Sequence, residues 1–210
     1  MNRLFIKSFL FFLFVVIVSC STIRKDKLKV DNSLIKEIYL KDIEIRELDA
    51  KTDTVNLEEY DKKHREQIFQ LLAENKVITS RDKIRAAWIL QHTAAKFCDG
   101  ELTSLSSENF LLAYKLSSSA LSQLEREKDT LTIKKENIPR IIALNYDRYL
   151  LFTYGYQKFG TQFVFDDKTK EMLLAPIDTT LSSDAERKKY NVEPLNLLLS
   201  KYKMKPLSHK

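Results

Sequence analysis

The feature that most constrains the fold is the near absence of helix-breaking residues from the first two thirds of the chain. Proline does not occur before Pro139, and Gly100 is the only glycine before Gly155. Because proline and glycine are the strongest helix breakers, their absence favours long helices. Ser33 and Asn56 are the expected N-caps of the first two. Apolar residues at helical spacing predict helices over residues 34–48, 57–75, 80–98, 107–115 and 119–127, the last two forming either one helix or two.

The pattern changes in the last third of the chain. Pro139 suits the first turn of a helix, and Gly155 is placed to end it. The elements expected here are a helix over 141–152, a hairpin of strands 161–165 and 171–175 turning at 166–168, a short helix from Ser182 or Ser183 to Lys189, and a last helix from Pro194 to Tyr202. We therefore predict one mainly α domain over residues 33–205, with a small C-terminal β-hairpin.

Composition excludes several classes of protein. The 210 residues include 35 basic and 29 acidic side chains, a net charge of +6 that is interleaved along the chain and argues against a nucleic-acid partner. The three glycines, Gly100, Gly155 and Gly160, do not form a phosphate-binding loop. Two cysteines build neither a disulfide framework nor a cysteine-based zinc site. The sequence therefore predicts no cofactor and no metal.

The amino terminus resembles a bacterial lipoprotein signal peptide. Basic Arg3 and Lys7 precede an apolar stretch that is short for a membrane span and stops at Ile17-Val18-Ser19-Cys20. This resemblance implies cleavage after residue 19, lipidation of Cys20 with acyl groups such as palmitate, and a bacterial envelope location, with Ser21 favouring the outer membrane. Residues 20–32 are then a polar tether, either attracted by its basic residues to anionic headgroups or simply solvated. The alternative is an uncleaved anchor helix.

Polar residues interrupt otherwise apolar segments at four places, and they are candidates for a site. His92 is the natural proton-transfer group, because an imidazole titrates near neutral pH. Asp147 is the residue expected to orient it, so these two are the candidate catalytic residues. The candidate ligand-binding residues are Gln91, Arg148, Gln157, Gln162, Asp42 and Arg46.

A buried polar network is the alternative interpretation of these clusters. Asp42–Arg46 and Asp147–Arg148 are then structural ion pairs, because unpaired charges among apolar side chains are costly. His92 is then a hydrogen-bonded core histidine. His64 lies among charged residues and is expected on an exposed face, so no second histidine at ligand spacing supports a metal site.

The order of these motifs resembles an uncharacterised bacterial family, a domain of unknown function often found in secreted or lipid-anchored proteins. Its pattern is Asp-Gln-x-x-Arg, Ala-Trp…Gln-His, Asp-Arg, Gln-x-Tyr-Gly-Thr-Gln and Arg…Gly-Leu…Pro-Leu. The matching residues are Asp42 and Arg46, Ala87-Trp88 and Gln91-His92, Asp147-Arg148, Gln157 with Phe159-Gly160-Thr161-Gln162, and Arg187 with Asn191-Val192 and Pro194-Leu195. Ile43, Phe159 and Asn191 depart from the pattern. The resemblance covers about residues 34–202 and implies a shared fold and site, but no reaction.

Two functions are consistent with the sequence. The first is a lipid-anchored envelope protein that acts as a binding or interaction module for a protein or peptide of the envelope. The alternative is a hydrolase or transferase that uses His92 as acid and base in a polar pocket with Asp147, Arg148 and Gln162. The separation of these side chains in space distinguishes the two.

Overall fold

The structure is a computed structural model that describes residues 30–93, 95–98, 101–104 and 106–206. A compact unit begins at Asp31. The predicted signal peptide, the predicted lipidation site Cys20 and most of the predicted tether lie outside the described residues. In the described part, no helix is both long enough and apolar enough to cross a membrane.

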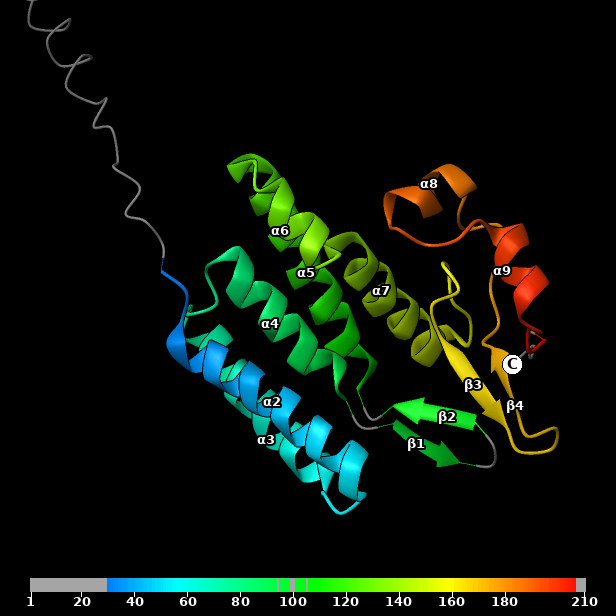
Figure 1. Ribbon diagram of the computed structural model, residues 1–210, viewed down its shortest axis with the longest axis horizontal. Helices are drawn as coiled ribbons and strands as arrows, with labels where there is room; N and C mark the ends of the chain where they lie inside the picture. The colour runs from blue at the N-terminus through cyan, green and yellow to red at the C-terminus, as the bar shows by residue number, and fades with distance from the viewer. Residues whose placement is uncertain (1–29, 94, 99–100, 105, 207–210) are drawn as a thin grey trace, which may run out of the picture. The chain divides into compact units, whose positions relative to one another are not determined.

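The compact unit is mainly helical, with a two-stranded antiparallel hairpin near its C-terminus (Figure 1). This confirms the predicted fold class. The helices of the described residues are α2 (Ser33–Thr52), α3 (Leu57–Ala73), α4 (Ser80–Gln91), α5 (Ser107–Glu127), α6 (Thr130–Lys135), α7 (Ile138–Tyr154), α8 (Asp184–Lys189) and α9 (Leu195–Lys201). The strands are β1 (Ala95–Cys98), β2 (Glu101–Ser104), β3 (Phe163–Asp166) and β4 (Glu171–Leu174).

Side-chain caps fix where the first helices begin. Asn32, rather than the predicted Ser33, caps α2, because its side chain accepts from the backbone N–H groups of Leu34 and Ile35. Asn56 caps α3 as predicted. Thr79 and Asp82 form a reciprocal capping box at the start of α4.

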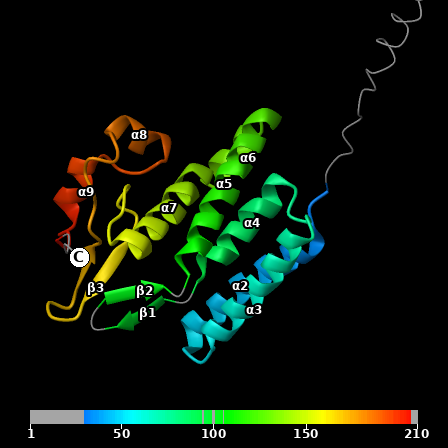
Figure 2. The ribbon, with the colours of Figure 1, turned by 180° about the vertical axis from the view of Figure 1, so that it is seen from behind.

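The helices pack side by side and bury two apolar clusters. One joins α2, α3 and α4 and includes Ile35, Ile68 and Leu90. The other joins α4, α5 and α7 and includes Leu124 and Ile142. Both views show α5 between α4 and α7 (Figures 1 and 2). Helix α4 contributes to both clusters, so its C-terminal end is held firmly between two helical layers.

The predicted helix over residues 80–98 is wrong after Gln91. Helix α4 ends at Gln91, His92 is its C-cap, and residues 95–98 pair with 101–104 as the antiparallel strands β1 and β2. The hairpin over 163–174 is therefore not the only one, as the sequence had suggested. Because α4 ends at Gln91, His92 lies at the end of the helix, and its ring is not confined to one helix face.

The C-terminal part packs on α7 through a second set of contacts. Gly155 ends α7 with a φ of +82°, which a glycine adopts without strain. Strands β3 and β4 then pair in the expected hairpin, with Phe163 opposite Leu174. Leu174, Ile177 and Leu198 bury the hairpin against α9.

Candidate functional site

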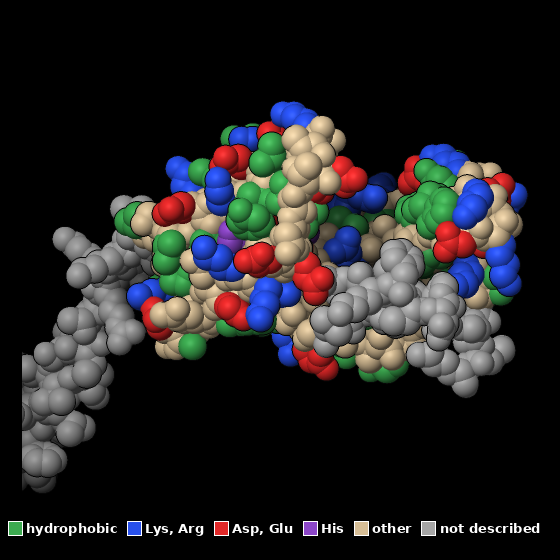
Figure 3. Space-filling model, turned by 90° about the horizontal axis from the view of Figure 1, so that it is seen from below, with side chains coloured by type: hydrophobic (Ala, Val, Ile, Leu, Met, Phe, Trp, Pro, Cys, Tyr) green, Lys and Arg blue, Asp and Glu red, His purple; other side chains and the backbone are tan. Residues whose placement is uncertain are grey.

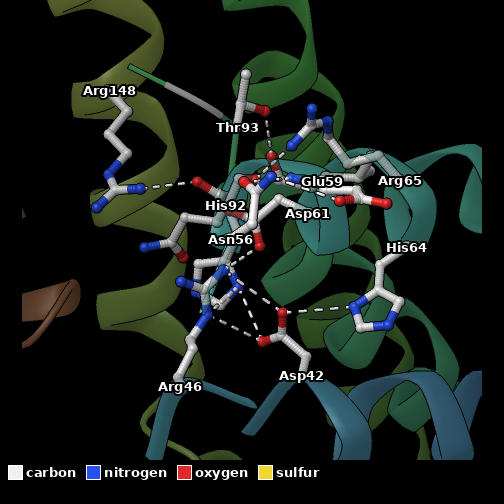
Figure 4. Close-up of polar contacts among 12 residues, drawn as sticks. Asp42, Arg46, Asn56, Glu59, Asp61, His64, Arg65, His92, Thr93 and Arg148 are labelled. Carbon is white, nitrogen blue, oxygen red and sulfur yellow. Dashed lines mark hydrogen bonds and ion pairs between the residues drawn. The ribbon is translucent and has the colours of Figure 1, made fainter. Parts of the chain in front are cut away.

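The candidate site centres on His92, whose Nδ1 lies 3.0 Å from Oδ2 of Asp42 on α2 (Figure 4). The Asp42 side chain is only 5% exposed, whereas that of His92 is 21% exposed. Arg46 Nε donates to Asp42 Oδ2 at 3.3 Å and to His92 Nδ1 at 3.1 Å, so Nδ1 accepts from Arg46 when it carries no proton and donates to Asp42 when it does. We assign the Nδ1 proton to the bond with Asp42, because a buried carboxylate is the stronger acceptor and Arg46 Nε already has that carboxylate as its partner. Nε2 then carries the free lone pair, and no side chain of the described residues bonds to it.

Asp42 is the shared acceptor of the cluster. His64 on α3 places its Nδ1 3.7 Å from Asp42 Oδ1, within ion-pair range but without a hydrogen bond. Burial alone would raise the pKa of the Asp42 carboxyl, but the two imidazoles and Arg46 outweigh burial and hold it well below its usual range. Asp42 is therefore ionised at neutral pH and serves as the charged acceptor of the cluster.

Arg46 joins this carboxylate to a second one. Its guanidinium forms ion pairs with Asp42 and with Asp61 of α3. Burial raises the pKa of Asp61, although the nearby guanidinium favours the ionised form. The single guanidinium of Arg46 offsets part of the negative charge of Asp42 and Asp61, so these three side chains together carry only a small net negative charge.

The same acids raise the question of a metal. Ligand atoms of Asp42, Asp61 and His92 all lie within 4.8 Å of one another. However, the guanidinium of Arg46 is bonded to both carboxylates and already supplies the cation between them. Within the described residues, the arrangement therefore fits an ion-pair cluster better than a metal site.

An open groove runs between α2 and the C-terminal end of α4, with a volume of about 390 Å³. Its polar lining consists of Asp42, Arg46, Glu47 and His92, while Tyr39 and Trp88 contribute aromatic walls. Seen from below, the molecule has intermixed acidic and basic side chains at its surface, and a histidine is visible among them (Figure 3). The groove is within the size range of small-molecule sites and leaves His92 accessible to a ligand.

Arg148 approaches the site from α7. Its Nη1 donates to the backbone oxygen of Gln91 at 2.8 Å, and its Nε donates to Oε1 of Gln162 at 3.1 Å (Figure 4 shows the former). It makes no ion pair with Asp147 or with any other acid of the described residues. Burial, and then the positive charge of Arg46, lower the pKa of Arg148. Arg148 thus fixes the backbone at Gln91, next to His92, without lining the groove itself.

Asp147 points to a different part of the fold. Its two oxygens accept from the backbone N–H groups of Lys158, Phe159 and Thr161 and from the Thr161 hydroxyl, at 2.8–2.9 Å. Asp147 is fully buried. The expectation that it orients His92 is therefore wrong, because both oxygens are bound to this loop, and the carboxylate beside His92 belongs to Asp42.

Gln157 completes that loop. Its amide donates to the backbone oxygens of Gln162 and Ala175 and accepts from the backbone N–H of Gln162. This fixes Gln162, whose side chain then reaches Arg148. Three of the predicted site residues, Asp42, Arg46 and His92, line the groove. Arg148 links the backbone of Gln91, beside the groove, to the side chain of Gln162. Asp147 and Gln157 instead hold the loop before β3, in another part of the fold.

Sequence reasoning missed three residues of α3. Asp61 and His64 belong to the cluster, and Arg65 donates to the backbone oxygen of His92 at 2.6 Å. His64 is only 5% exposed, so its expected place on an exposed face is wrong. A signal was present, because Asp61 and Arg65 repeat the Asp-x-x-x-Arg spacing of Asp42 and Arg46.

Comparison with models of protein families, with curated proteins and with solved structures finds no match to this chain.

Proposed function

We propose that the protein is a lipid-anchored envelope hydrolase or transferase in which His92, held by Asp42, acts as the general acid and base. The observation that carries this proposal is the 3.0 Å contact between His92 Nδ1 and the buried Asp42 carboxylate, in a groove that leaves the imidazole partly exposed. A carboxylate that fixes the tautomer and favours the imidazolium is what a catalytic histidine requires.

The proton path follows from this geometry. Nε2 of His92 takes a proton from a water molecule or from a substrate hydroxyl as that oxygen attacks, and returns it to the leaving group. Asp42 stabilises the imidazolium formed in between. The described lining of the groove includes the carboxylates Asp42 and Glu47 but no serine, threonine, cysteine or lysine. In this proposal a water molecule or a substrate hydroxyl is the nucleophile.

A binding module remains the second candidate, favoured by the aromatic and aliphatic walls of the groove. Tyr39, Ile43 and Trp88 bury the apolar part of a ligand there, with Asp42 and Arg46 supplying polar contacts. In this case His92 contributes a hydrogen bond and no proton transfer. The two candidates differ in what removal of the imidazole does to turnover.

The test is to assay the purified full chain on panels of chromogenic esters, phosphodiesters and glycosides. His92→Gln should lower turnover by about 100-fold or more, and Asp42→Asn should lower it as well. Glu44→Gln on the exposed surface of α2 is the matched control and should leave turnover unchanged. Turnover that survives His92→Gln, or its absence across all panels, favours the binding module.

The tautomer offers a test that needs no substrate. Nitrogen NMR of labelled protein should show that the neutral imidazole of His92 is protonated at Nδ1 and unprotonated at Nε2. Asp42→Asn should redistribute the proton between the two nitrogens, because the carboxylate no longer holds it at Nδ1. The opposite tautomer in the unmodified chain contradicts the assigned dyad.

A further inference from the structure

A second cavity, of about 430 Å³, lies between the first half of α4 and α6. Three cationic side chains line it, Arg81 and Arg85 from α4 and Lys135 from α6, against a single acid, Glu136. Tyr39 lines both this cavity and the His92 groove. The excess of positive charge indicates a ligand with a negative charge.

Two of these cations are available to a ligand. Arg85 is mostly buried and pairs with Asp31 at 3.2 Å, so its charge is largely compensated. The Arg81 side chain is 60% exposed and its closest acid, Asp31, lies 4.0 Å away. Lys135 is exposed and makes no ion pair within the described residues. Arg81 and Lys135 therefore offer guanidinium and ammonium groups to an anion at the edge of the cavity.

The cavity lies beside the point where the chain joins the compact unit. Asp31, the first residue of that unit, accepts from the Thr79 hydroxyl at 2.8 Å and from Arg85 at 3.2 Å. Eleven positions separate it from Cys20. A fully extended chain of that length spans at most about 40 Å. A lipid on Cys20 therefore keeps this cavity within reach of the membrane surface.

An apolar side chain accompanies the charges. Leu131 of α6 lines the cavity and is 76% exposed. An exposed leucine beside lysine and arginine suits the boundary between headgroups and acyl chains. There the leucine contacts the acyl chains and the basic side chains contact the phosphates. The combination favours a phospholipid over a small soluble anion, which has no apolar part for Leu131 to contact.

We propose that this cavity binds the anionic headgroup of a phospholipid in the membrane that carries the Cys20 anchor. The phosphate lies against Arg81 and Lys135, and Leu131 contacts the start of the acyl chains. The proposal rests on the lipid-anchor part of the proposed function and is independent of any reaction at His92. It gives the anchored protein a preferred face toward the membrane.

The experiment uses the mature chain from residue 20 with Cys20→Ser, so that no acyl group contributes to binding. Co-sedimentation with phosphatidylglycerol vesicles in 0.1 M salt should show binding that phosphatidylcholine vesicles lack and that 0.5 M salt weakens. The double variant Arg81→Gln, Lys135→Gln should bind about 30-fold more weakly, since each basic residue near an anionic surface contributes a factor of several. Lys168→Gln, Lys170→Gln, in the turn between β3 and β4, removes the same charge elsewhere and should bind as before.

Each alternative has a distinct outcome. Equal binding by the two double variants overturns the proposal, because the basic tether alone then accounts for attraction to the vesicles. Binding of glycerol 3-phosphate in calorimetry without vesicle binding also overturns it, in favour of a soluble phosphate ligand. Leu131→Ser, on an exposed position that should fold, should weaken vesicle binding but leave glycerol 3-phosphate binding unchanged. Fatty-acid labelling of Cys20 is measured separately, so failure of the anchor is distinguished from failure of the cavity.

Discussion

Asp147 shows how one carboxylate fixes a loop. Four donors converge on its two oxygens, three of them backbone N–H groups of residues 158–161. Burial raises the pKa of Asp147, while these hydrogen bonds favour the ionised form. The loop has few other backbone partners, so its path depends on this side chain. The ion pair between Asp147 and Arg148, which their adjacency in the sequence suggested, does not form. Consecutive side chains of a helix point in different directions.

We expect Asp147→Ala to lower the free energy of unfolding by about 3–5 kcal/mol, because three backbone N–H groups, one of them buried and two partly buried, lose their acceptor. Asp178→Ala is the matched control, since Asp178 also accepts from a backbone N–H, that of Thr180, but at an exposed turn. Its loss should be under about 1 kcal/mol. Urea unfolding measures both. A loss below about 1 kcal/mol for Asp147→Ala would contradict the role assigned to it.

Among the elements, those with strong local signals were predicted and those set by tertiary packing were not. Helix α7 and the β3–β4 hairpin follow from Pro139, Gly155 and a turn of aspartates, which act through local backbone preferences. The end of α4 was missed because residues 92–98 continue without a breaker. The end of α4 is held partly by non-local contacts, since Arg65 and Arg148 bind the backbone oxygens of His92 and Gln91, and partly by the Thr93 hydroxyl, which donates to the Leu90 oxygen.

Two glycines in the same region should respond differently to alanine. Gly160 has a φ of +75°, and an added Cβ would meet the side chains of Leu198 and Ile177. Gly155 has a φ of +82° but has open space around it. Gly155→Ala should cost about 1–2 kcal/mol from backbone strain alone. Gly160→Ala should cost about 1–3 kcal/mol more, because α9 must also move.

Urea unfolding of the two variants checks this difference. Equal losses would mean that α9 moves away without cost, and that the close packing of the hairpin on α9 contributes little. A larger loss for Gly160→Ala should be accompanied by weakened contacts between Arg148 and Gln162. The latter follows Gly160 by two residues and depends on the same loop.

At the scale of the whole molecule, the site depends on residues far apart in the chain. Asp42, Asp61 and His92 come from three helices, and Arg148 from a fourth. The sequence identified His92, Asp42 and Arg148 as polar interruptions of apolar segments. It did not show which carboxylate meets His92, because that depends on how α2 and α3 pack on α4. The i, i+4 spacing correctly predicted the ion pair of Asp42 and Arg46 within α2, but it carries no information about contacts between helices.

The last prediction concerns the lipid anchor proposed at Cys20. The sequence Ile17-Val18-Ser19-Cys20 ends the N-terminal apolar stretch, as a lipobox does. Cys20→Ala removes the thiol that receives diacylglycerol, so the variant should incorporate no labelled palmitate and should accumulate as an uncleaved or mislocalised precursor. More than one acyl chain is needed for stable membrane anchoring, so the mature wild-type chain should stay with membranes through a high-salt wash. Ser21→Ala keeps the thiol and serves as the control for labelling. Labelling of Cys20→Ala at the wild-type level would refute the anchor and leave the basic tether as the only link to the membrane.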